Sequence, residues 1–223
     1  MGKAYIIGTG PGDEELLTVK AVKVLEKCTA VLYDRLVSNN ILNYLKEDCE
    51  IYYCGKEPGC HYKTQEEINE MIVSLVKKGH VVGRIKGGDP YVFGRGGEEV
   101  LALKEVLSLQ KEGLEFEVIP GVTSPIAVLN YAGIPITQRG MSQGFHIITG
   151  MTAADEKINW QALAKEIGTL VFMMGLENIE RIMSNLLENG KDGSTPAAIV
   201  MRGTSSKQKK VIGTVDNICA KAR

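Results

Sequence analysis

Short apolar runs alternate with amphipathic helical patterns along the whole chain of 223 residues, and this alternation constrains the fold most strongly. The apolar runs predict strands at 3–8, 30–34, 49–55, 80–88, 145–150, 169–175 and 196–202. Helical spacing of apolar residues predicts helices at 14–27, 64–78, 97–111, 160–167 and 178–189. Thr64, followed by Glu67 three residues later, is a capping-box pattern. Such alternation is typical of parallel strands with helices on the faces of the sheet.

A Pro/Gly segment at 117–125 (EVIPGVTSP) interrupts the alternation near the middle of the chain, where a predicted strand runs into a turn. We therefore expect two α/β domains, covering 1–118 and 119–223. Their combined length suffices for two modest hydrophobic cores. A cleft between two such domains is a usual place for a small-molecule site.

Charge and hydropathy exclude several classes of partner. The formal net charge is −1, whereas proteins that follow nucleic acid backbones usually carry a basic surplus. No apolar run approaches the roughly 20 residues that a membrane-spanning helix needs. The apolar stretch near the N-terminus is too short for a signal peptide. These features predict a cytoplasmic protein that binds neither nucleic acid nor membrane.

The five cysteines fit neither a zinc-binding nor a disulfide pattern, so reduced thiols are the preferred interpretation. The alternative is that Cys54, Cys60 and His61 are soft metal ligands, but the sequence offers no second ligand pair.

The motif GTGPGD at 8–13 lies between a predicted strand and a predicted helix. Its glycines allow a tight turn and close approach to a ligand. In a dinucleotide loop, free N–H groups at a helix N-terminus bind pyrophosphate. Here Pro11 removes one donor, and Asp13 would repel phosphate. The motif favours a ligand without phosphates, with a simple tight turn as the alternative.

Asp34 and Arg35, in YDRLVS, follow the predicted strand at 30–34. Ligands of open α/β sheets lie beyond the carboxyl ends of the strands. A carboxylate placed there can act as a base or orient a partner, whereas a surface ion pair or a helix cap is the alternative.

Glycines crowd the segment GRIKGGDPYVFGRGGEE at 83–99, which runs from a strand through a loop into a helix. Because glycine loses much backbone entropy on folding, so many glycines in one loop favour a functional role. Asp89 could accept hydrogen bonds from ribose hydroxyls or an amino group. Arg95 could hold a carboxylate through two hydrogen bonds.

Two further motifs offer ligand-binding groups with simpler alternatives. Thr123 and Ser124 in PGVTSP carry hydroxyls at an expected helix start, where they could instead cap the helix. Met174, after the predicted strand at 169–175, could form an apolar wall, or it could be a core methionine.

Taken together, these motifs resemble the tetrapyrrole methylase family. GTGPGD, YDRLVS, GGDPYVFGRGGEE, PGVTSPIA, YAGIPIT, FMMGL and RGTSSKQ occur in the order and spacing of that family and cover nearly the whole chain. The glycine-rich GGDPYVFGRGGEE is the most specific, and it is similar to the version in members that methylate uroporphyrinogen III.

The resemblance implies two α/β domains with mixed, largely parallel sheets of about five strands each, rather than the Rossmann-type methyltransferase fold. It places the tetrapyrrole on the side of 1–118 and the cofactor, a folded S-adenosylmethionine, on the side of 119–223. It also implies a homodimer.

The resemblance further assigns roles to residues at matching positions. It implies general base and acid roles for Asp34 and Lys56. It places Arg95, Glu98 and Arg139 at the substrate or its protons. The residues that would contact the cofactor are Pro11, Gly87, Gly88, Asp89, Val92, Thr123, Ser124, Met174 and Gly203.

The implied reaction transfers methyl groups from S-adenosylmethionine to carbons 2 and 7 of uroporphyrinogen III, giving precorrin-2 and S-adenosylhomocysteine, without a metal. The small-molecule substrate carries eight carboxylates, so a pocket with Arg and Lys side chains is expected. A sulfonium is already a strong methyl donor, so the protein has mainly to align it with a pyrrole carbon and accept a proton.

The sequence departs from the family pattern in three places. Gln138 stands where His is expected, Met151 follows the TG at which TGH is common, and members usually continue past the helix that we expect the last residues to begin. Alternative functions are a sibling methylase acting on another corrin precursor, a non-catalytic cofactor or tetrapyrrole sensor, and an enzyme using GTGPGD as a phosphate loop.

Overall fold

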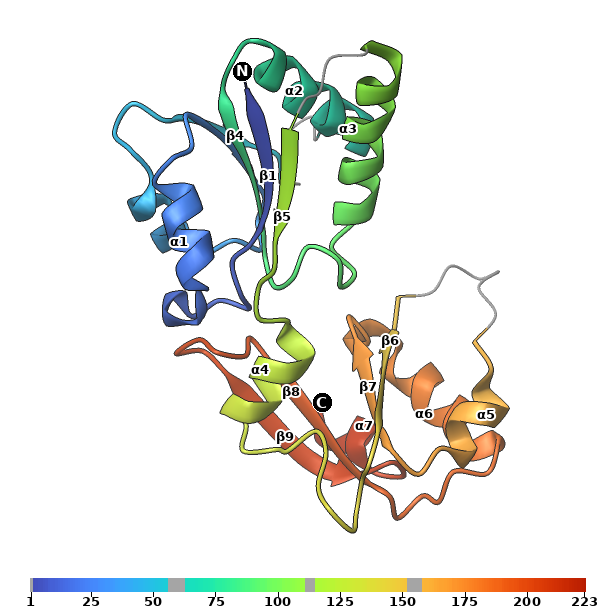
Figure 1. The fold of residues 1–223 in the computed structure, drawn as a ribbon. Coiled ribbons are helices and arrows are strands. Elements are labelled where there is room, and N and C mark those ends of the chain that lie inside the picture. The colour runs from blue at the N-terminus through green and yellow to red at the C-terminus, as the bar shows by residue number, and fades with distance from the viewer. Residues whose placement is uncertain (1, 56–62, 111–114, 152–157) are drawn as a thin grey trace. The chain divides into compact units, whose positions relative to one another are not determined.

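The computed structural model describes residues 2–55, 63–110, 115–151 and 158–223 (Figure 1). The chain divides into two compact units, Met1–Ser124 and Pro125–Arg223. The division falls at the end of the Pro/Gly segment 117–125. The two units are described one at a time.

The first unit is built on a five-stranded sheet in which every pairing is parallel. Its strand order is β3-β2-β4-β1-β5. The strands are β1 (Lys3–Gly8), β2 (Ala30–Tyr33), β3 (Glu50–Tyr53), β4 (Val81–Lys86) and β5 (Glu115–Ile119). Because all five strands point the same way, the loops after them meet along one edge, where ligands of such sheets bind.

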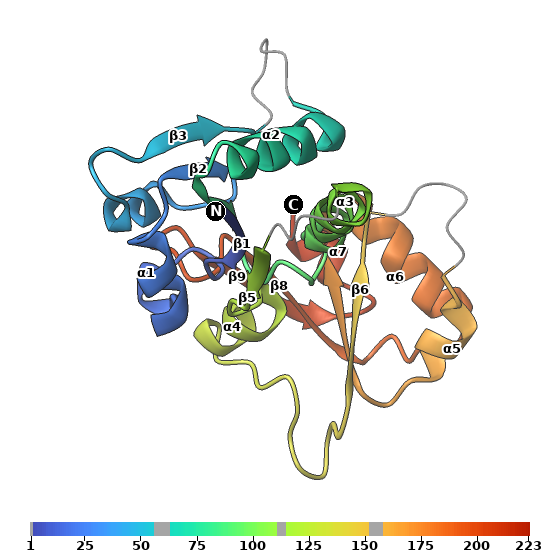
Figure 2. The ribbon, with the colours of Figure 1, turned by 45° about the horizontal axis from the view of Figure 1, so that its top comes forward.

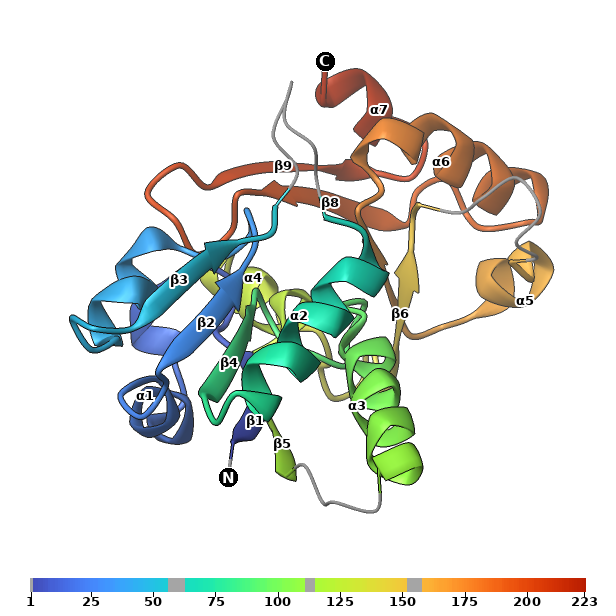
Figure 3. The same cartoon turned by 90° about the horizontal axis from the view of Figure 1, so that it is seen from above.

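Helices cover both faces of this sheet, as the predicted alternation required (Figures 1 and 3). Helix α1 (Val19–Leu25) packs with Ile7 on one face, and α2 (Gln65–Lys77) and α3 (Gly96–Gln110) pack with Ala4 and Ile6 on the other. Successive side chains of a strand point to opposite faces, so β1 contributes to two hydrophobic cores. The short 3₁₀ helix η2 (Asn39–Tyr44) follows β2.

The helix expected at 14–27 begins later than predicted. A 3₁₀ turn, η1 (Glu14–Leu16), comes first, capped by the Asp13 carboxylate, which accepts a hydrogen bond from Glu15 N. Thr18 has extended backbone angles and its hydroxyl accepts a hydrogen bond from Ala21 N, so α1 starts at Val19. The apolar spacing continues across both pieces and hides the break.

The capping box predicted at Thr64 is confirmed. The Thr64 hydroxyl accepts a hydrogen bond from Glu67 N at 3.2 Å, and the Glu67 carboxylate accepts one from Thr64 N at 2.6 Å. These two bonds satisfy backbone donors that the first turn of a helix otherwise leaves without partners.

Within its described residues the second unit contains two small sheets, so the expected sheet of about five strands in this half is wrong (Figures 1 and 2). Strands β6 and β7 pair in parallel, whereas β8 and β9 form an antiparallel pair. Its strands are β6 (Phe145–Thr149), β7 (Thr169–Met173), β8 (Pro196–Met201) and β9 (Lys209–Thr214). Its helices are α4 (Ser124–Tyr131), α5 (Trp160–Lys165), η3 (Leu176–Asn178), α6 (Ile179–Glu188) and α7 (Ile218–Lys221). Helix α4 begins at Ser124, the last residue of the first unit.

Helix α6 supplies much of the apolar packing of the second unit. Ile182 and Leu186 lie one turn apart on it and are buried, as is Ile218 of α7. The rings of Trp160 and Phe172 stack with their centroids 6.0 Å apart, and this contact packs α5 against β7. In the part of the chain that the structure describes, no helix combines the length and the apolar character needed to cross a membrane.

Candidate active site

Three glycines bring three loops together at the carboxyl edge of the five-stranded sheet. Gly88 and Gly10 exchange two backbone hydrogen bonds, of 2.6 and 3.2 Å. A Cβ atom on Gly121 would lie 2.2 Å from the Gly88 carbonyl oxygen, and one on Gly8 would lie 2.6 Å from Gly121 N. Any side chain at Gly8 or Gly121 would separate the loops. We call Gly8, Gly88 and Gly121 the glycine cradle.

Asp89 connects two loops of the glycine cradle through hydrogen bonds. Its Oδ1 atom accepts a hydrogen bond from Tyr91 N at 2.8 Å, and its Oδ2 atom accepts one from Gly121 N at 3.1 Å. The carboxylate therefore links the loop after β4 to the loop after β5. Each carboxylate oxygen can accept a second hydrogen bond, so a ligand donor can still bind Asp89.

Backbone strain marks the loop that follows the cradle. Phe93 and Arg95 have positive φ angles, of 54° and 57°, which non-glycine residues rarely adopt. Between them, a Cβ atom on Gly94 would lie 2.7 Å from the Pro90 carbonyl oxygen. The strained loop leaves the Phe93 ring 46% exposed. Such strain is concentrated at functional sites in proteins.

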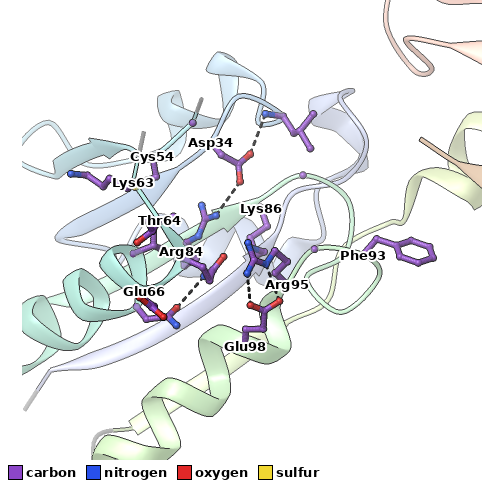
Figure 4. A pocket seen from close by; sticks show the side chains of 17 residues that line it. Asp34, Cys54, Lys63, Thr64, Glu66, Arg84, Lys86, Phe93, Arg95 and Glu98 are labelled. Atoms are coloured by element: carbon purple, nitrogen blue, oxygen red, sulfur yellow. Dashed lines mark hydrogen bonds and ion pairs between the residues drawn. The ribbon is translucent and has the colours of Figure 1, made fainter. Parts of the chain in front are cut away.

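Arg95 and Glu98 form a two-pronged ion pair at the start of α3. Arg95 Nε donates to Glu98 Oε1 at 2.8 Å, and Arg95 Nη2 donates to Glu98 Oε2 at 2.6 Å (Figure 4). The Arg95 side chain is 58% exposed, and the Glu98 side chain is 50% exposed. The hydrogen bonding between the two side chains raises the pKa of Arg95 and lowers the pKa of Glu98. Arg95 thus already presents the geometry that binds a carboxylate.

An open pocket of about 760 Å³ lies in the first unit beside these groups (Figure 4). Asp34, at the end of β2, and Gly87, at the end of β4, line it together with Arg95 and Glu98. Four cationic side chains lie in its wall: Lys63, Arg84, Lys86 and Arg95. Arg84 and Lys86 are only 4% and 5% exposed and bind Glu99, so Lys63 and the exposed Arg95 are the cations that suit a ligand with carboxylates.

Asp34 is held from two sides. Its Oδ1 atom accepts a hydrogen bond from Leu36 N at 3.1 Å, and its Oδ2 atom accepts one from Arg84 Nη2 at 3.0 Å. The Asp34 side chain remains 27% exposed, so the carboxylate can meet a ligand in the pocket.

A buried charge cluster, formed by Arg84, Lys86 and Glu99, lies behind Asp34. Glu99 Oε1 accepts from Arg84 Nε at 2.8 Å and from Lys86 Nζ at 2.9 Å. Burial alone would lower the pKa of Arg84, but the carboxylates of Glu99 and Asp34 outweigh it and raise that pKa. Burial and the Arg84 cation lower the pKa of Lys86, despite the opposing effect of Glu99.

Sequence reasoning missed this cluster. Arg84 and Lys86 lie on either side of Ile85 in a strand whose other residues are apolar or glycine, at the start of the glycine-rich segment 83–99. Charged residues inside an apolar run that is predicted to be a buried parallel strand need buried partners, and this signal could have found them.

The remaining expected cofactor residues of the first unit lie at the same edge. Pro11 follows Gly10, and Val92, Thr123 and Ser124 are partly buried. A Cβ atom on Gly88 would lie 4.0 Å from Ser124 N, at the start of α4. Pro11, Gly87, Gly88, Asp89, Val92 and Thr123 therefore all lie in loops or turns beyond the strand ends, and Ser124 is the first residue of α4.

Three expected site residues belong to the second unit. Met174 follows β7 with a φ angle of 56° and is 49% exposed, so it is not a core methionine. Gly203 follows β8 and packs against Val128, since a Cβ atom there would lie 2.4 Å from the valine side chain. Arg139 is exposed beside the bridge between Gln138 and Ser142.

Lys56, the expected general acid, lies outside the described residues, as do Cys60 and His61. Cys54 is buried in the pocket wall, and burial raises the pKa of its thiol. Among the described residues, no group of three or more His, Cys, Asp or Glu side chains could hold a metal ion.

The sequence of this chain matches known proteins of a single family. Residues 3–219 match the model of the family described as tetrapyrrole (corrin/porphyrin) methylases. Uroporphyrinogen-III C-methyltransferases from Bacillus subtilis and Methanocaldococcus jannaschii are 51% and 46% identical to this chain. These matches cover 98% and 100% of this chain and 83% and 90% of those proteins.

A solved structure extends the match to three dimensions. Uroporphyrin-III C-methyl transferase from Thermus thermophilus, complexed with S-adenosylhomocysteine, is 35% identical with a TM-score of 0.80. The match covers 98% of this chain and 86% of that protein. The expected fold class, two α/β domains with largely parallel sheets, is confirmed. By sequence and by fold, this chain belongs to the tetrapyrrole methylase family.

Proposed function

We propose that this protein transfers methyl groups from S-adenosylmethionine to carbons 2 and 7 of uroporphyrinogen III, giving precorrin-2 and S-adenosylhomocysteine. The observation that carries the proposal is the 51% identity, over 98% of the chain, to a uroporphyrinogen-III C-methyltransferase. The pocket supports it, because Asp34, Lys63 and Arg95 line one cavity beside the glycine cradle.

The glycine cradle fits S-adenosylmethionine, a ligand without phosphates. Gly8 and Gly121 let the loops touch, whereas a Cβ atom on Gly88 would meet only Ser124 N, at 4.0 Å, so the backbone at Gly88 is open to close approach by a ligand. We propose that Pro11, Gly87, Gly88 and Asp89 contact the cofactor from the first unit. The other proposed contacts are Val92, Thr123, Ser124, Met174 and Gly203. When bound, S-adenosylmethionine supplies an electrophilic methyl group.

Asp34 is the proposed proton acceptor. A pyrrole carbon that gains a methyl group leaves the ring positively charged, and loss of one proton from a neighbouring bridge carbon restores neutrality. Asp34 lies at the pocket wall with both oxygens oriented by hydrogen bonds, and it can accept that proton. Lys56 is the proposed general acid.

Arg95 is the proposed anchor for a substrate carboxylate. Its guanidinium already binds the Glu98 carboxylate through two hydrogen bonds, so a substrate carboxylate of the same shape can replace Glu98. The exposed Phe93 ring offers an apolar surface to a flat macrocycle. Arg139, in the second unit, is a further proposed substrate contact.

The assembly and location are also part of the proposal. We infer a homodimer from the family resemblance, to be tested by sedimentation equilibrium. We place the protein in the cytoplasm, a reducing compartment, and the free thiols of Cys28, Cys49, Cys54 and Cys219 support this location.

The deciding experiment incubates the purified protein with S-adenosylmethionine and uroporphyrinogen III under anaerobic conditions, followed by oxidation and mass spectrometry. We expect two added methyl groups. Asp34→Asn should lower kcat by about 100- to 10,000-fold, as loss of a general base does. Asp192→Asn, at an exposed turn of the second unit, is the matched control and should retain wild-type turnover.

Three other outcomes would redirect the proposal. Binding of S-adenosylmethionine without methylation of uroporphyrinogen III would favour a sibling methylase, to be tested with other corrin precursors. Binding of both ligands without any turnover would indicate a sensor. Absence of binding to S-adenosylmethionine in calorimetry would overturn the proposal.

A further inference from the structure

The first turn of α3 carries two adjacent glutamates with opposite surroundings. Glu98 is half exposed and faces Arg95, whereas Glu99 is fully buried and faces Arg84 and Lys86. The side chains of Arg84 and Lys86 are only 4% and 5% exposed. The proposed mechanism gives the buried cluster no role so far.

Stability alone does not explain the cluster. Removing charges from water costs several kcal/mol for each ion, and a buried ion pair is often no more stable than apolar residues of the same size. Glu99 Oε1 accepts three hydrogen bonds, from Arg84, Lys86 and, at 3.3 Å, from Gln65. Glu99 Oε2 is buried and accepts none from the described residues. A cluster that served only stability would satisfy both oxygens.

Arg84 connects this cluster to the pocket. One edge of its guanidinium donates to Glu99 at 2.8 Å, and Nη2 donates to Asp34 at 3.0 Å. A third bond, from Nη1 to the Ile85 carbonyl oxygen at 3.0 Å, restrains the group further. Because a guanidinium is planar and rigid, the position of Glu99 determines where Arg84 presents its donor to Asp34.

We infer that Glu99, acting through Arg84, positions the Asp34 carboxylate for proton transfer, so that both are positioning residues for turnover. This inference rests on the proposed function, in which Asp34 accepts the proton. It adds a specific expectation: changes at Glu99 or Arg84 should affect kcat while leaving the affinity for S-adenosylmethionine and the KM for the tetrapyrrole nearly unchanged.

The test measures kcat, KM, the Kd for S-adenosylmethionine and the thermal unfolding of Glu99→Gln and Arg84→Gln. We expect kcat at the pH optimum to fall about 10- to 100-fold in both, which is typical when a catalytic group is misplaced by an ångström. Glu117→Gln is the matched control. It removes ion pairs with Lys3, 3.4 Å long, and with Lys20, on the edge strand β5, which does not line the pocket, and it should retain wild-type turnover.

Several results would overturn the inference. These are unchanged kcat in folded Glu99→Gln, or equal losses of cofactor affinity and kcat. Should Arg84→Gln fail to fold, Arg84→Lys replaces it. This variant keeps the cation but cannot bridge both carboxylates, so kcat should fall about tenfold while the KM for the tetrapyrrole stays nearly unchanged. Wild-type kcat in Arg84→Lys would also overturn the inference.

Failure of the proposed function is distinguishable from failure of this inference. If the wild-type protein does not methylate uroporphyrinogen III, the proposed function fails before any variant is compared. If the wild type is active and the variants behave like Glu117→Gln, only the positioning role fails.

Discussion

At the scale of single residues, the site depends on where side chains are absent as much as on where they are present. Gly121 allows the loop after β5 to touch the loop after β4, and the Asp89 carboxylate then joins them. The absence of a side chain at Gly121 and the hydrogen bond from Gly121 N to Asp89 both favour the same contact between these two loops. Substitutions at such positions therefore test the cradle directly.

Gly121→Ala should weaken binding of S-adenosylmethionine by at least about tenfold and destabilise the protein by about 2 kcal/mol. The new Cβ atom would lie 2.2 Å from a backbone oxygen, and overpacking of this kind usually costs about 1–3 kcal/mol. Calorimetry and urea unfolding measure the two effects. Gly144→Ala is the control, because a Cβ atom there would meet nothing within 4 Å. Wild-type affinity in Gly121→Ala would contradict the cradle.

Cys28 should make stability fall at alkaline pH. Burial, with a smaller contribution from Cys49, raises the pKa of the Cys28 thiol from 9.0 to about 12. Between these values the folded protein holds a proton that the unfolded chain loses. The stabilisation is therefore complete below pH 9 and is lost as the pH rises toward 12. Its slope approaches roughly 1.4 kcal/mol per pH unit.

Urea unfolding of the wild type and Cys28→Ala at several pH values between 8 and 10.5 tests this expectation. The free energy of unfolding should decrease more steeply with pH in the wild type above pH 9, because only the wild type has this thiol to ionise. Curves that stay parallel up to pH 10.5 would refute it.

At the scale of elements, helix starts carry much of the local information. α3 begins with residues that turn one glutamate toward Arg95 and the next toward Arg84, so a single helical turn serves both the exposed and the buried side of the site. α2 begins with a capping box whose two bonds are local to the chain.

Thr64→Ala should lower the free energy of unfolding by about 1 kcal/mol, because Glu67 N loses its acceptor at the start of α2. Thr64→Ser keeps the hydroxyl and should recover most of that loss. Urea denaturation at pH 7 compares the three proteins. Equal stability of the alanine and threonine proteins would show that solvent replaces the cap.

At the scale of the whole molecule, a bound cofactor adds stability to the folded state. S-adenosylhomocysteine at 100 times its Kd should stabilise the protein by about 2.7 kcal/mol. For a chain of this size this is a rise in Tm of roughly 5–10 °C. Differential scanning calorimetry measures the shift.

ATP is the control ligand for that calorimetry experiment. Pro11 removes a phosphate donor from the GTGPGD loop and Asp13 repels phosphate, so ATP should leave Tm unchanged. A shift with ATP and none with S-adenosylhomocysteine would favour the phosphate-loop enzyme instead.

Local patterns were enough to predict most elements of both units. The apolar runs correspond to β1 to β4 and β6 to β8, and the capping box starts α2 as predicted. Strand β9 was missed, because KKVIGT begins with two lysines and contains a glycine, which strands disfavour. The predicted helix at 14–27 ignored the capping ability of Thr18, a signal that was present in the sequence.

The sequence by itself determined the period of most elements, the Pro/Gly turn near the middle of the chain and the family, since each depends on neighbours within a few residues or on motifs in order. Only the tertiary structure decided which charges are buried together. Arg84 meets Asp34 because β4 pairs with β2, and it meets Glu99 because α3 packs on that face of the sheet. Strand order depends on burying apolar faces of distant segments, which no local pattern encodes.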